Sequence, residues 1–417
     1  MKRYDSYKDS GVEWIGEIPS RWELSRIRYY IDYQKGKNPK EFCFIENTNT
    51  KIYLTMDYLR GNPKQILFVE NSEEYLEVEN NQILLLWDGS NAGEFVLSKE
   101  GILSSTMAVL NIRHLQKEFS WYYLKYFEIY LRESTIGMGV PHVNGGELKN
   151  SYIIIPPILE QTAIASFLDR KTTEIDQLIT NKKRLIELYE EEKTAIINRA
   201  VTKGIDPDVK LKDSGIEWLG EIPEHWEVKR MKNICSVRQG LQIPIEKRHL
   251  TQVDNSFEYI TIKSINNPEH PKEYIAYPSK NVICSSDDIL MARTGATGEP
   301  IINVEGVFHN NFFLIDYDRG VADKKFLYYF FKSIRIKEYL LLVAGTTTIP
   351  DLNHSEFYNT PFFKFSKKEQ RFIINHIETA CSRINSKISK TKNLIDLLLE
   401  YRTTLISEVV TGKIKVV

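Results

Sequence analysis

The chain has 417 residues, of which 42% are apolar and 27% charged, and its formal net charge is −1. This length exceeds one ordinary core and predicts at least two domains, and the apolar content excludes a disordered chain. A near-neutral total weakly disfavours a protein that holds nucleic acid alone through a basic field, although it can hide a local basic face. Four scattered cysteines and the lack of a long apolar run lead us to expect a reducing cytoplasm and no membrane.

The chain repeats itself. Residues 8–23, KDSGVEWIGEIPSRWE, return at 212–227 as KDSGIEWLGEIPEHWE, with 12 of the 16 positions identical. A second repeat, a long run of charged and apolar residues, starts at Glu160-Gln161 and again at Glu369-Gln370. The series of short motif, variable block and long helix therefore runs twice, which predicts two similar surfaces for one elongated partner.

The repeat divides the chain into six predicted segments. They are a repeat motif at 1–23, a variable block at 24–155, a long helix at 156–203, a connector with the second motif at 204–227, a second variable block at 228–364 and a second long helix at 365–412. Both variable blocks mix short apolar strands with one helix, predicted at 119–133 and 324–340, so we expect mixed α/β domains. The strand-like runs start at 52, 82 and 107 in the first block and at 259, 288 and 312 in the second.

Both long helices carry an apolar stripe at heptad spacing. The expected packing residues are Leu168, Ile175, Leu178 and Leu185 on the first helix and Ile377, Ile384, Leu394 and Leu398 on the second. Such a stripe needs a cover, and two copies related by a pseudo-twofold repeat pack most simply as an antiparallel coiled coil. The predicted fold class is α/β, with two similar mixed domains separated by two long antiparallel helices. Two independent helices, each packed on its own block, are the alternative.

Motifs of self-contained catalysis are missing from the sequence. It has no GxxxxGK[ST] and no HExxH, and Asn267-Pro268 runs on to Glu269 where an amino-methyltransferase would need Pro-Pro-aromatic. We therefore predict neither a catalytic residue nor a metal site in this chain.

Paired polar loops are the candidate binding elements. WDGSNAGE at 87–94 aligns with ARTGATGE at 292–299, each after an apolar strand, and PHVN at 141–144 corresponds to PDLN at 350–353. Glycine-rich turns approach a groove closely, and Arg or Asn side chains read base edges, although ordinary hairpin turns are the alternative. The predicted DNA-binding residues are Lys37, Asp88, Ser90, Asn91, His142 and Asn144 in the first block and Arg238, Gln242, Lys263, Arg293, Thr294, Thr297, Thr347 and Asn353 in the second.

The order of these elements resembles the DNA-specificity subunit of type I restriction-modification systems. The resemblance rests on SGxEWxGEIPxxW twice, on IIIPPILEQTAIASFLD at 153–169, and on Gly36 and Gly240 after the first strand of each block. The second helix start, FSKKEQ at 365–370, lacks the Pro-Pro of the first.

The resemblance implies a non-catalytic subunit whose blocks are target recognition domains, each reading half of a bipartite, asymmetric double-stranded DNA sequence. The helices would set the spacing and dock two methylation subunits, to which two nuclease-translocase subunits can be added. S-adenosylmethionine, ATP and Mg²⁺ would belong to those partners, with no cofactor in this chain. The alternatives are the reading module of a methylation-only system, a protein-binding scaffold, and an enzyme whose active site escapes a motif search.

Overall fold

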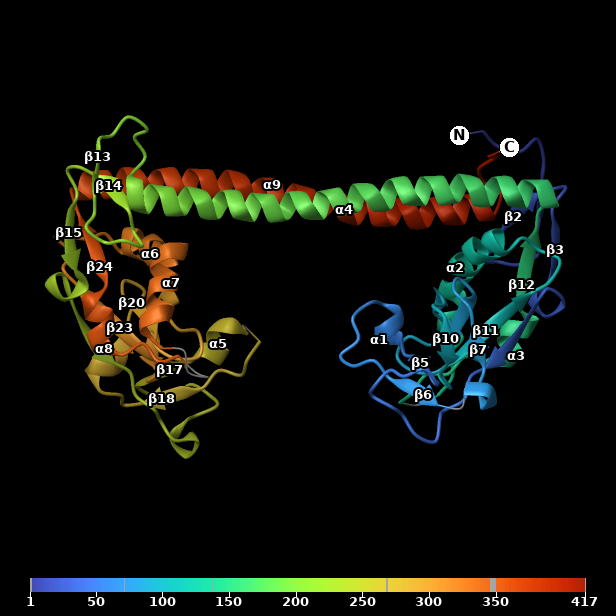
Figure 1. Ribbon diagram of the computed structural model, residues 1–417, viewed down its shortest axis with the longest axis horizontal. Helices are drawn as coiled ribbons and strands as arrows, with labels where there is room; N and C mark the ends of the chain where they lie inside the picture. The colour runs from blue at the N-terminus through green and yellow to red at the C-terminus, as the bar shows by residue number, and fades with distance from the viewer. Residues whose placement is uncertain (1, 71, 138, 268, 346–349, 417) are drawn as a thin grey trace. The chain divides into compact units, whose positions relative to one another are not determined.

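The computed structural model describes residues 2–70, 72–137, 139–267, 269–345 and 350–416. The chain forms two compact units (Figure 1). Unit 1 comprises Met1–Lys182 and Asn393–Val417, and unit 2 comprises Lys183–Lys392. Unit 1 is therefore built from both ends of the chain, whereas unit 2 is one continuous stretch.

Unit 1 contains two four-stranded sheets. The first is antiparallel, in the order β4-β11-β8-β9, with bounds Ile31–Lys35, Met107–Ile112, Ile83–Leu86 and Phe95–Leu97. The second runs β6-β5-β10-β7, with bounds Phe68–Glu70, Thr50–Leu54, Gly101–Leu103 and Glu77–Val78, and its β5–β10 pair is parallel. The inner strands β8 and β10 are buried along their whole length, which explains their continuous apolar runs.

Unit 2 repeats this topology with a different sequence. Its antiparallel sheet is β16-β23-β20-β21, with bounds Cys235–Gln239, Phe312–Tyr317, Ile289–Ala292 and Pro300–Ile302. Its second sheet is β18-β17-β22-β19, with bounds Tyr274–Ala276, Ser256–Ile260, Gly306–Phe308 and Ile283–Cys284, again with one parallel pair. Both variable blocks therefore share one scaffold.

Shorter elements complete each unit. Two-stranded pairs are β1–β2 (Tyr7–Asp9, Glu17–Pro19), β3–β12 (Glu23–Arg26, Tyr152–Ile155), β13–β14 (Leu211–Asp213, Glu221–Pro223) and β15–β24 (Glu227–Arg230, Pro361–Lys364). The helices are α1 (Met56–Leu59), α2 (Lys117–Glu133), α3 (Gly145–Asn150), α5 (Ile262–Asn266), α6 (Lys324–Lys332), α7 (Ile334–Val343) and α8 (His354–Asn359). The long helices are α4 (Ile158–Lys203) and α9 (Lys367–Val410).

Two local predictions need correction. The runs predicted as strands at 52–59 and 259–265 are strands only as far as Leu54 and Ile260, because the hydroxyls of Thr55 and Thr261 then cap the short helices α1 and α5. The single helix predicted at 324–340 is two helices, since Ser333 has extended backbone angles between α6 and α7. Its hydroxyl donates to the carbonyl of Phe330, which ends the first helix.

The repeated motif anchors the first turn of each long helix. In unit 1 the indole Nε1 of Trp22 donates to Glu160 Oε2 over 2.9 Å, and the Tyr4 hydroxyl donates to the same oxygen over 3.0 Å. Burial, together with this hydrogen bond, raises the pKa of Tyr4. In unit 2 the indole of Trp226 donates to Glu369 over 2.9 Å. Both tryptophans are fully buried, so each glutamate has a fixed partner.

The glutamine beside each glutamate has an equally specific partner. Gln161 Oε1 accepts the backbone N–H of Gln116 over 2.9 Å, and Gln370 Oε1 accepts that of Asp323 over 2.8 Å. Gln116 and Asp323 are the residues immediately before α2 and α6. The repeated Glu-Gln pair therefore joins three elements, namely the motif, the long helix and the helix of the variable block.

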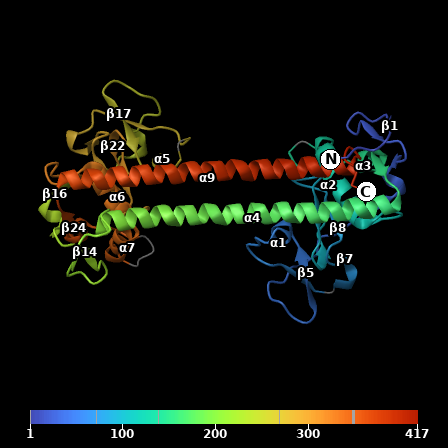
Figure 2. The same ribbon diagram turned by 90° about the horizontal axis from the view of Figure 1, so that it is seen from above.

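The same motif meets the end of the other long helix. A Cβ on Gly412, just after α9, would lie 2.9 Å from the Trp22 ring, and one on Gly204, just after α4, would lie 3.7 Å from the Trp226 ring. In each unit the start of one long helix therefore lies beside the end of the other (Figure 2). The helices are antiparallel, and the predicted fold class is confirmed.

The buried seam of the helix pair differs from the predicted one at two of the eight residues. Leu168, Ile175, Ile377 and Ile384 are buried as expected, and Leu185 and Leu398 are half-buried. Leu178 and Leu394 were wrongly assigned to it, because they are 47% and 39% exposed while their neighbours Ile179 and Ile395 are buried. A heptad seam alternates steps of three and four residues. The prediction stepped three residues from Ile175 to a leucine, whereas the buried residue lies four residues on.

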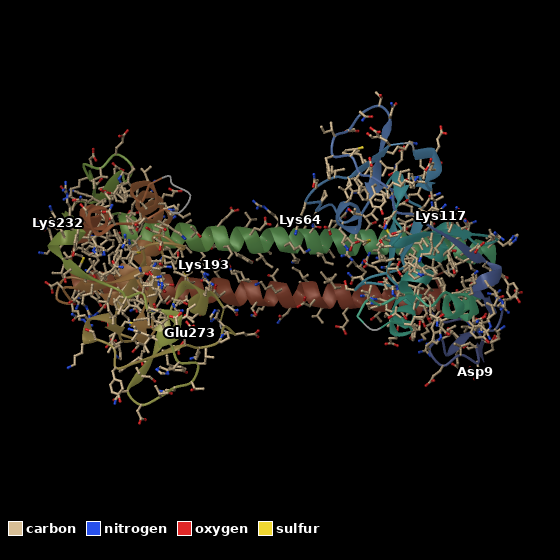
Figure 3. The ribbon with its side chains drawn as sticks, turned by 90° about the horizontal axis from the view of Figure 1, so that it is seen from below. Asp9, Lys64, Lys117, Lys193, Lys232 and Glu273 are labelled. Carbon is tan, nitrogen blue, oxygen red and sulfur yellow. The ribbon has the colours of Figure 1, made fainter. Side chains whose placement is uncertain are left out.

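Polar contacts join the helices inside each unit. In unit 1, Arg402 Nε lies 3.2 Å from Asp176 Oδ1. In unit 2, Lys193 Nζ, labelled in Figure 3, donates to Asn385 Oδ1 over 3.2 Å. These exposed contacts each stabilise the pair only slightly but constrain its register.

Ile388→Asp should destabilise the helix pair by about 3 kcal/mol, because an unpaired carboxylate would replace a buried side chain. The matched control is Leu178→Asp, on the exposed face, with an expected cost below about 1 kcal/mol. Urea unfolding followed by helical circular dichroism measures both. Equal losses in the two variants would contradict this assignment of the seam.

Candidate nucleic-acid interface

The predicted loops of unit 1 lie together. The backbone N–H groups of Trp87 and Asp88 both donate to the carbonyl of Thr106, over 2.7 and 3.3 Å. The Val143 N–H donates to the carbonyl of Trp87 over 2.9 Å, and His142 Nδ1 lies 2.6 Å from Asp88 Oδ1. The loop after β8 and the segment before α3 therefore form one surface.

Unit 2 builds the same surface with other side chains. The N–H groups of Arg293 and Thr294 donate to Asn311, and the Leu352 N–H donates to Arg293. The Arg293 guanidinium pairs with both carboxylate oxygens of Asp351, over 2.5 and 2.7 Å. This two-point contact is the strongest geometry available to an arginine, and it raises the pKa of Arg293 further.

These hydrogen bonds correct the predicted alignment by one residue. Arg293 occupies the backbone position of Trp87, and Thr294 that of Asp88, because each pair makes the same contacts to the neighbouring turn. The first loop therefore holds one extra residue before its shared Gly-Glu end.

The two units place their acidic side chains on opposite partners of the loop pair. In unit 1 the acidic group, Asp88, is on the loop, whereas in unit 2 the acidic group, Asp351, is on the second segment.

Several predicted residues have a structural contact of their own. The side-chain oxygens of Asn144 and Asn353 cap α3 and α8. Thr297 is buried, and its hydroxyl donates to the Pro350 carbonyl over 2.8 Å. Asn91 accepts a hydrogen bond from Arg132 over 3.2 Å. These contacts order the loops and leave their DNA-binding role a prediction.

The remaining predicted residues lie at the surface. Lys37, Ser90, Gln242 and Lys263 are exposed, and Arg238 is half-buried, with one guanidinium nitrogen donating to the Asn281 carbonyl over 3.3 Å. Thr347 lies outside the described residues.

Sequence reasoning missed the residues that directly precede Gly36 and Gly240. In unit 1 the residue is Lys35, whose Nζ lies 3.7 Å from Asp88 Oδ2 and 4.8 Å from the Trp87 ring centroid. In unit 2 it is Gln239, which makes a 2.8 Å hydrogen bond with His354. Their position directly before glycines that the sequence had already singled out could have identified both residues.

Gly36 and Gly240 lie so close to a neighbouring backbone that neither position has room for a side chain. A Cβ at Gly36 would lie 2.2 Å from the carbonyl oxygen of Leu103, and one at Gly240 would lie 2.2 Å from that of His309. Any larger residue would force the first strand of the sheet away from the turn that supports the loops.

Two features are absent from the described residues. Within them, no cluster of three or more His, Cys, Asp or Glu side chains is arranged to hold a metal ion. None of the helices in the described ranges combines the length and apolar character needed to cross a bilayer.

Comparison with known proteins identifies the repeat. A family model described as type I restriction modification DNA specificity domain matches twice, at residues 19–188 and 223–394. The MjaVIII type I restriction enzyme specificity subunit of Methanocaldococcus jannaschii is 29% identical, with 96% of this chain and 94% of that protein covered. The EcoBI specificity subunit of Escherichia coli is 20% identical, over 82% of this chain and 77% of that protein.

Solved structures share the fold. A chain from a structure of type I restriction-modification complex assembly superimposes with a TM-score of 0.72 at 13% identity, covering 95% of this chain and 99% of that one. The HsdS subunit from Thermoanaerobacter tengcongensis superimposes with a TM-score of 0.54, also at 13% identity, covering 95% and 98%.

The turn that supports the unit 2 loops should respond to pH through His309. Burial lowers the pKa of His309 below its usual 6.5, as does the nearby Arg248, and its Nδ1 accepts the Asn311 N–H over 3.0 Å. Below about pH 6.5 the unfolded chain therefore binds more protons than the folded one, so the free energy of unfolding falls as pH is lowered from 7 to 5.

His309→Gln keeps a hydrogen-bond acceptor but removes the titrating ring, so we expect a flatter pH dependence of stability. Urea unfolding midpoints of the two proteins at pH 7, 6 and 5 test this. Parallel pH profiles would show that His309 does not contribute.

Proposed function

This chain belongs to the family of type I restriction-modification DNA specificity proteins, and from that premise we propose how it reads its target. It is a specificity subunit with two target recognition domains, one in each unit. Each domain reads one half of a bipartite, asymmetric duplex sequence through its paired loops.

One observation carries this proposal. The two domains present loops at equivalent strand ends, held by equivalent backbone hydrogen bonds, yet with different side chains at the tips. By position, Lys35 corresponds to Gln239, Trp87 to Arg293, Asp88 to Thr294 and His142 to Asp351. Base pairs differ in the hydrogen-bond donors and acceptors that they present in the major groove. A shared scaffold with different polar tips therefore suits two different half-sites.

The charge of the chain suggests that this subunit and its partners both contact the DNA phosphates. Exposed Lys37 and Lys263 can contact phosphates, but a net charge of −1 provides no strong field over the whole chain. We assign the rest of the phosphate contacts to partner subunits.

The two long helices have the length expected of a spacer between two DNA half-sites. A continuous helix of 46 residues, such as α4, extends about 69 Å at a rise of roughly 1.5 Å per residue. Exposed apolar side chains on the helices include Leu178, Leu188, Leu397 and Tyr401, which suit protein contacts. We propose that the pair sets the gap between half-sites and docks two methylation subunits, to which two nuclease-translocase subunits can be added.

We assign the chemistry to those partners and a non-catalytic role to this chain. Methyl transfer would use S-adenosylmethionine, and cleavage would use ATP and Mg²⁺, all bound by partner subunits. A system with methylation subunits alone would use the same reading function, and cleavage assays distinguish the two cases.

Arg293→Ala should impair recognition of one half-site only. The variant releases the clamp between Arg293 and Asp351, so the unit 2 loops lose their fixed geometry. We expect roughly tenfold lower methylation, with relaxed base preference confined to one half of the target. Sequencing of methylated DNA measures this. Asn91→Ala, a change in the corresponding loop of unit 1, should relax the other half, and losses in the same half would contradict separate readers.

Binding of the assembled complex to its bipartite duplex should weaken steeply with salt. Lys37→Ala should reduce the slope of log affinity against log salt by about one, because one phosphate contact is lost. The control is Lys117→Ala, at the start of α2 and outside the loops, with an expected unchanged slope. Binding that does not depend on salt would favour a protein-binding scaffold.

A further inference from the structure

Each unit exposes apolar side chains on one equivalent loop. In unit 2 the loop between β16 and β17 holds Ile245 and Leu250 with 71% and 75% of their surface exposed. In unit 1 the loop between β4 and β5 holds Phe44 and Ile45 with 61% and 79% exposed. Large apolar side chains this exposed within one loop of each unit favour a binding surface, because their contact with water is otherwise unfavourable.

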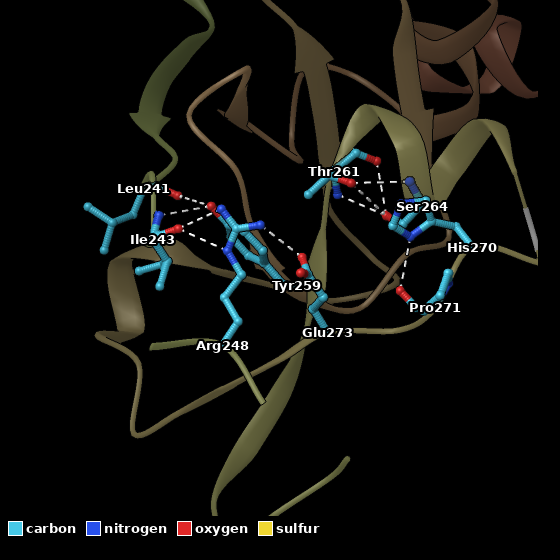
Figure 4. Close-up of polar contacts among 9 residues, drawn as sticks. All are labelled: Leu241, Ile243, Arg248, Tyr259, Thr261, Ser264, His270, Pro271 and Glu273. Carbon is cyan, nitrogen blue, oxygen red and sulfur yellow. Dashed lines mark hydrogen bonds and ion pairs between the residues drawn. The ribbon is translucent and has the colours of Figure 1, made fainter. Parts of the chain in front are cut away.

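A hydrogen-bonded base supports the unit 2 loop. The Tyr259 hydroxyl donates to the Leu241 carbonyl over 2.8 Å and accepts the Ile243 N–H over 3.0 Å (Figure 4). Arg248 donates twice to the Ile243 carbonyl, pairs with Glu273 over 3.0 Å and lies over the Tyr259 ring. Arg248 thus orders the loop from within, and the aliphatic side chains project from a fixed backbone.

Unit 1 holds its loop in the same way with a different sequence. Tyr53 occupies the β5 position that Tyr259 has in β17, and its hydroxyl donates to Asn38 within the loop over 2.8 Å. The backbone of Cys43 exchanges two hydrogen bonds with Phe68 of β6, as the backbone of His249 does with Tyr274 of β18. Two diverged loops that keep the same supports and the same exposed apolar character indicate a shared role.

The base of the apolar loop and the base of a reading loop rest on the same turn. The turn between β22 and β23 accepts the Arg293 and Thr294 N–H groups at Asn311 and the Leu241 N–H at Phe308. It also accepts the Gln239 side chain at Asn310 over 2.7 Å. One short turn therefore supports both loops at their bases, which makes a ligand shared by both loops a reasonable inference.

We propose that these loops are apolar wedges for the DNA duplex, an inference that rests on the proposed function. Ile245 and Leu250 would enter a base step beside the half-site read by unit 2, and Phe44 and Ile45 would do so for unit 1. Aliphatic and aromatic side chains inserted between base pairs unstack the step and bend the duplex. The exposed Lys247, beside Ile245, is placed to contact the adjacent phosphate.

The test uses the complex with its methylation subunits and duplexes that carry 2-aminopurine at successive positions of the target. Native complex should raise 2-aminopurine fluorescence at one step beside each half-site. Ile245→Ala/Leu250→Ala should abolish the signal beside one half only and weaken binding about tenfold. Phe44→Ala/Ile45→Ala should do the same beside the other half. Ile334→Ala, an exposed apolar change at the start of α7, is the control with no expected effect.

Three outcomes would overturn the wedge. Specific binding with unchanged fluorescence and affinity in both double variants rejects the wedge and leaves the proposed function standing. Loss of the methylation subunits from the variant complex would show that the loops bind protein instead. Equal affinity of the native complex for target and unrelated duplexes would reject the proposed function and the wedge together.

Discussion

The fold depends on a hydrogen bond between a buried tryptophan indole and a glutamate in the first turn of a long helix. Trp22 with Glu160 and Trp226 with Glu369 make this contact, and each tryptophan also meets the glycine that follows the other long helix. A negative carboxylate in the first turn is further favoured by the helix dipole. Because each motif holds one helix start and one helix end, the duplication produces an antiparallel pair and requires unit 1 to recruit the C-terminal part of the chain.

On this support the two recognition domains keep the same backbone contacts at their loops but carry different side chains there. Gly36 and Gly240 leave no room for a side chain, and the backbone contacts of Trp87 and Arg293 are the same. The side chains at the tips, by contrast, differ: Lys35, Trp87, Asp88 and His142 in unit 1 are replaced by Gln239, Arg293, Thr294 and Asp351 in unit 2. Conserved backbone geometry with changed hydrogen-bonding groups allows one architecture to serve two different sequences.

Periodicity and repetition predicted the elements, the domain class and the antiparallel helices, because these depend on local apolar pattern and on duplication. They could not separate Leu178 from Ile179, since both fit a heptad and tertiary packing selects between them. The Arg293–Asp351 clamp joins residues 58 positions apart, and the role of Lys35 depends on a loop that follows another strand. The proposed segment boundaries and the DNA contacts of the individual residues stay predictions.

Exchange of residues 24–155 for the corresponding block of a relative, followed by sequencing of methylated DNA, tests the central claim most directly. Independent domains on a shared helical spacer predict a new sequence in one half of the methylated target, with the other half and the gap between them unchanged. A target altered in both halves, or a changed gap, would contradict the account.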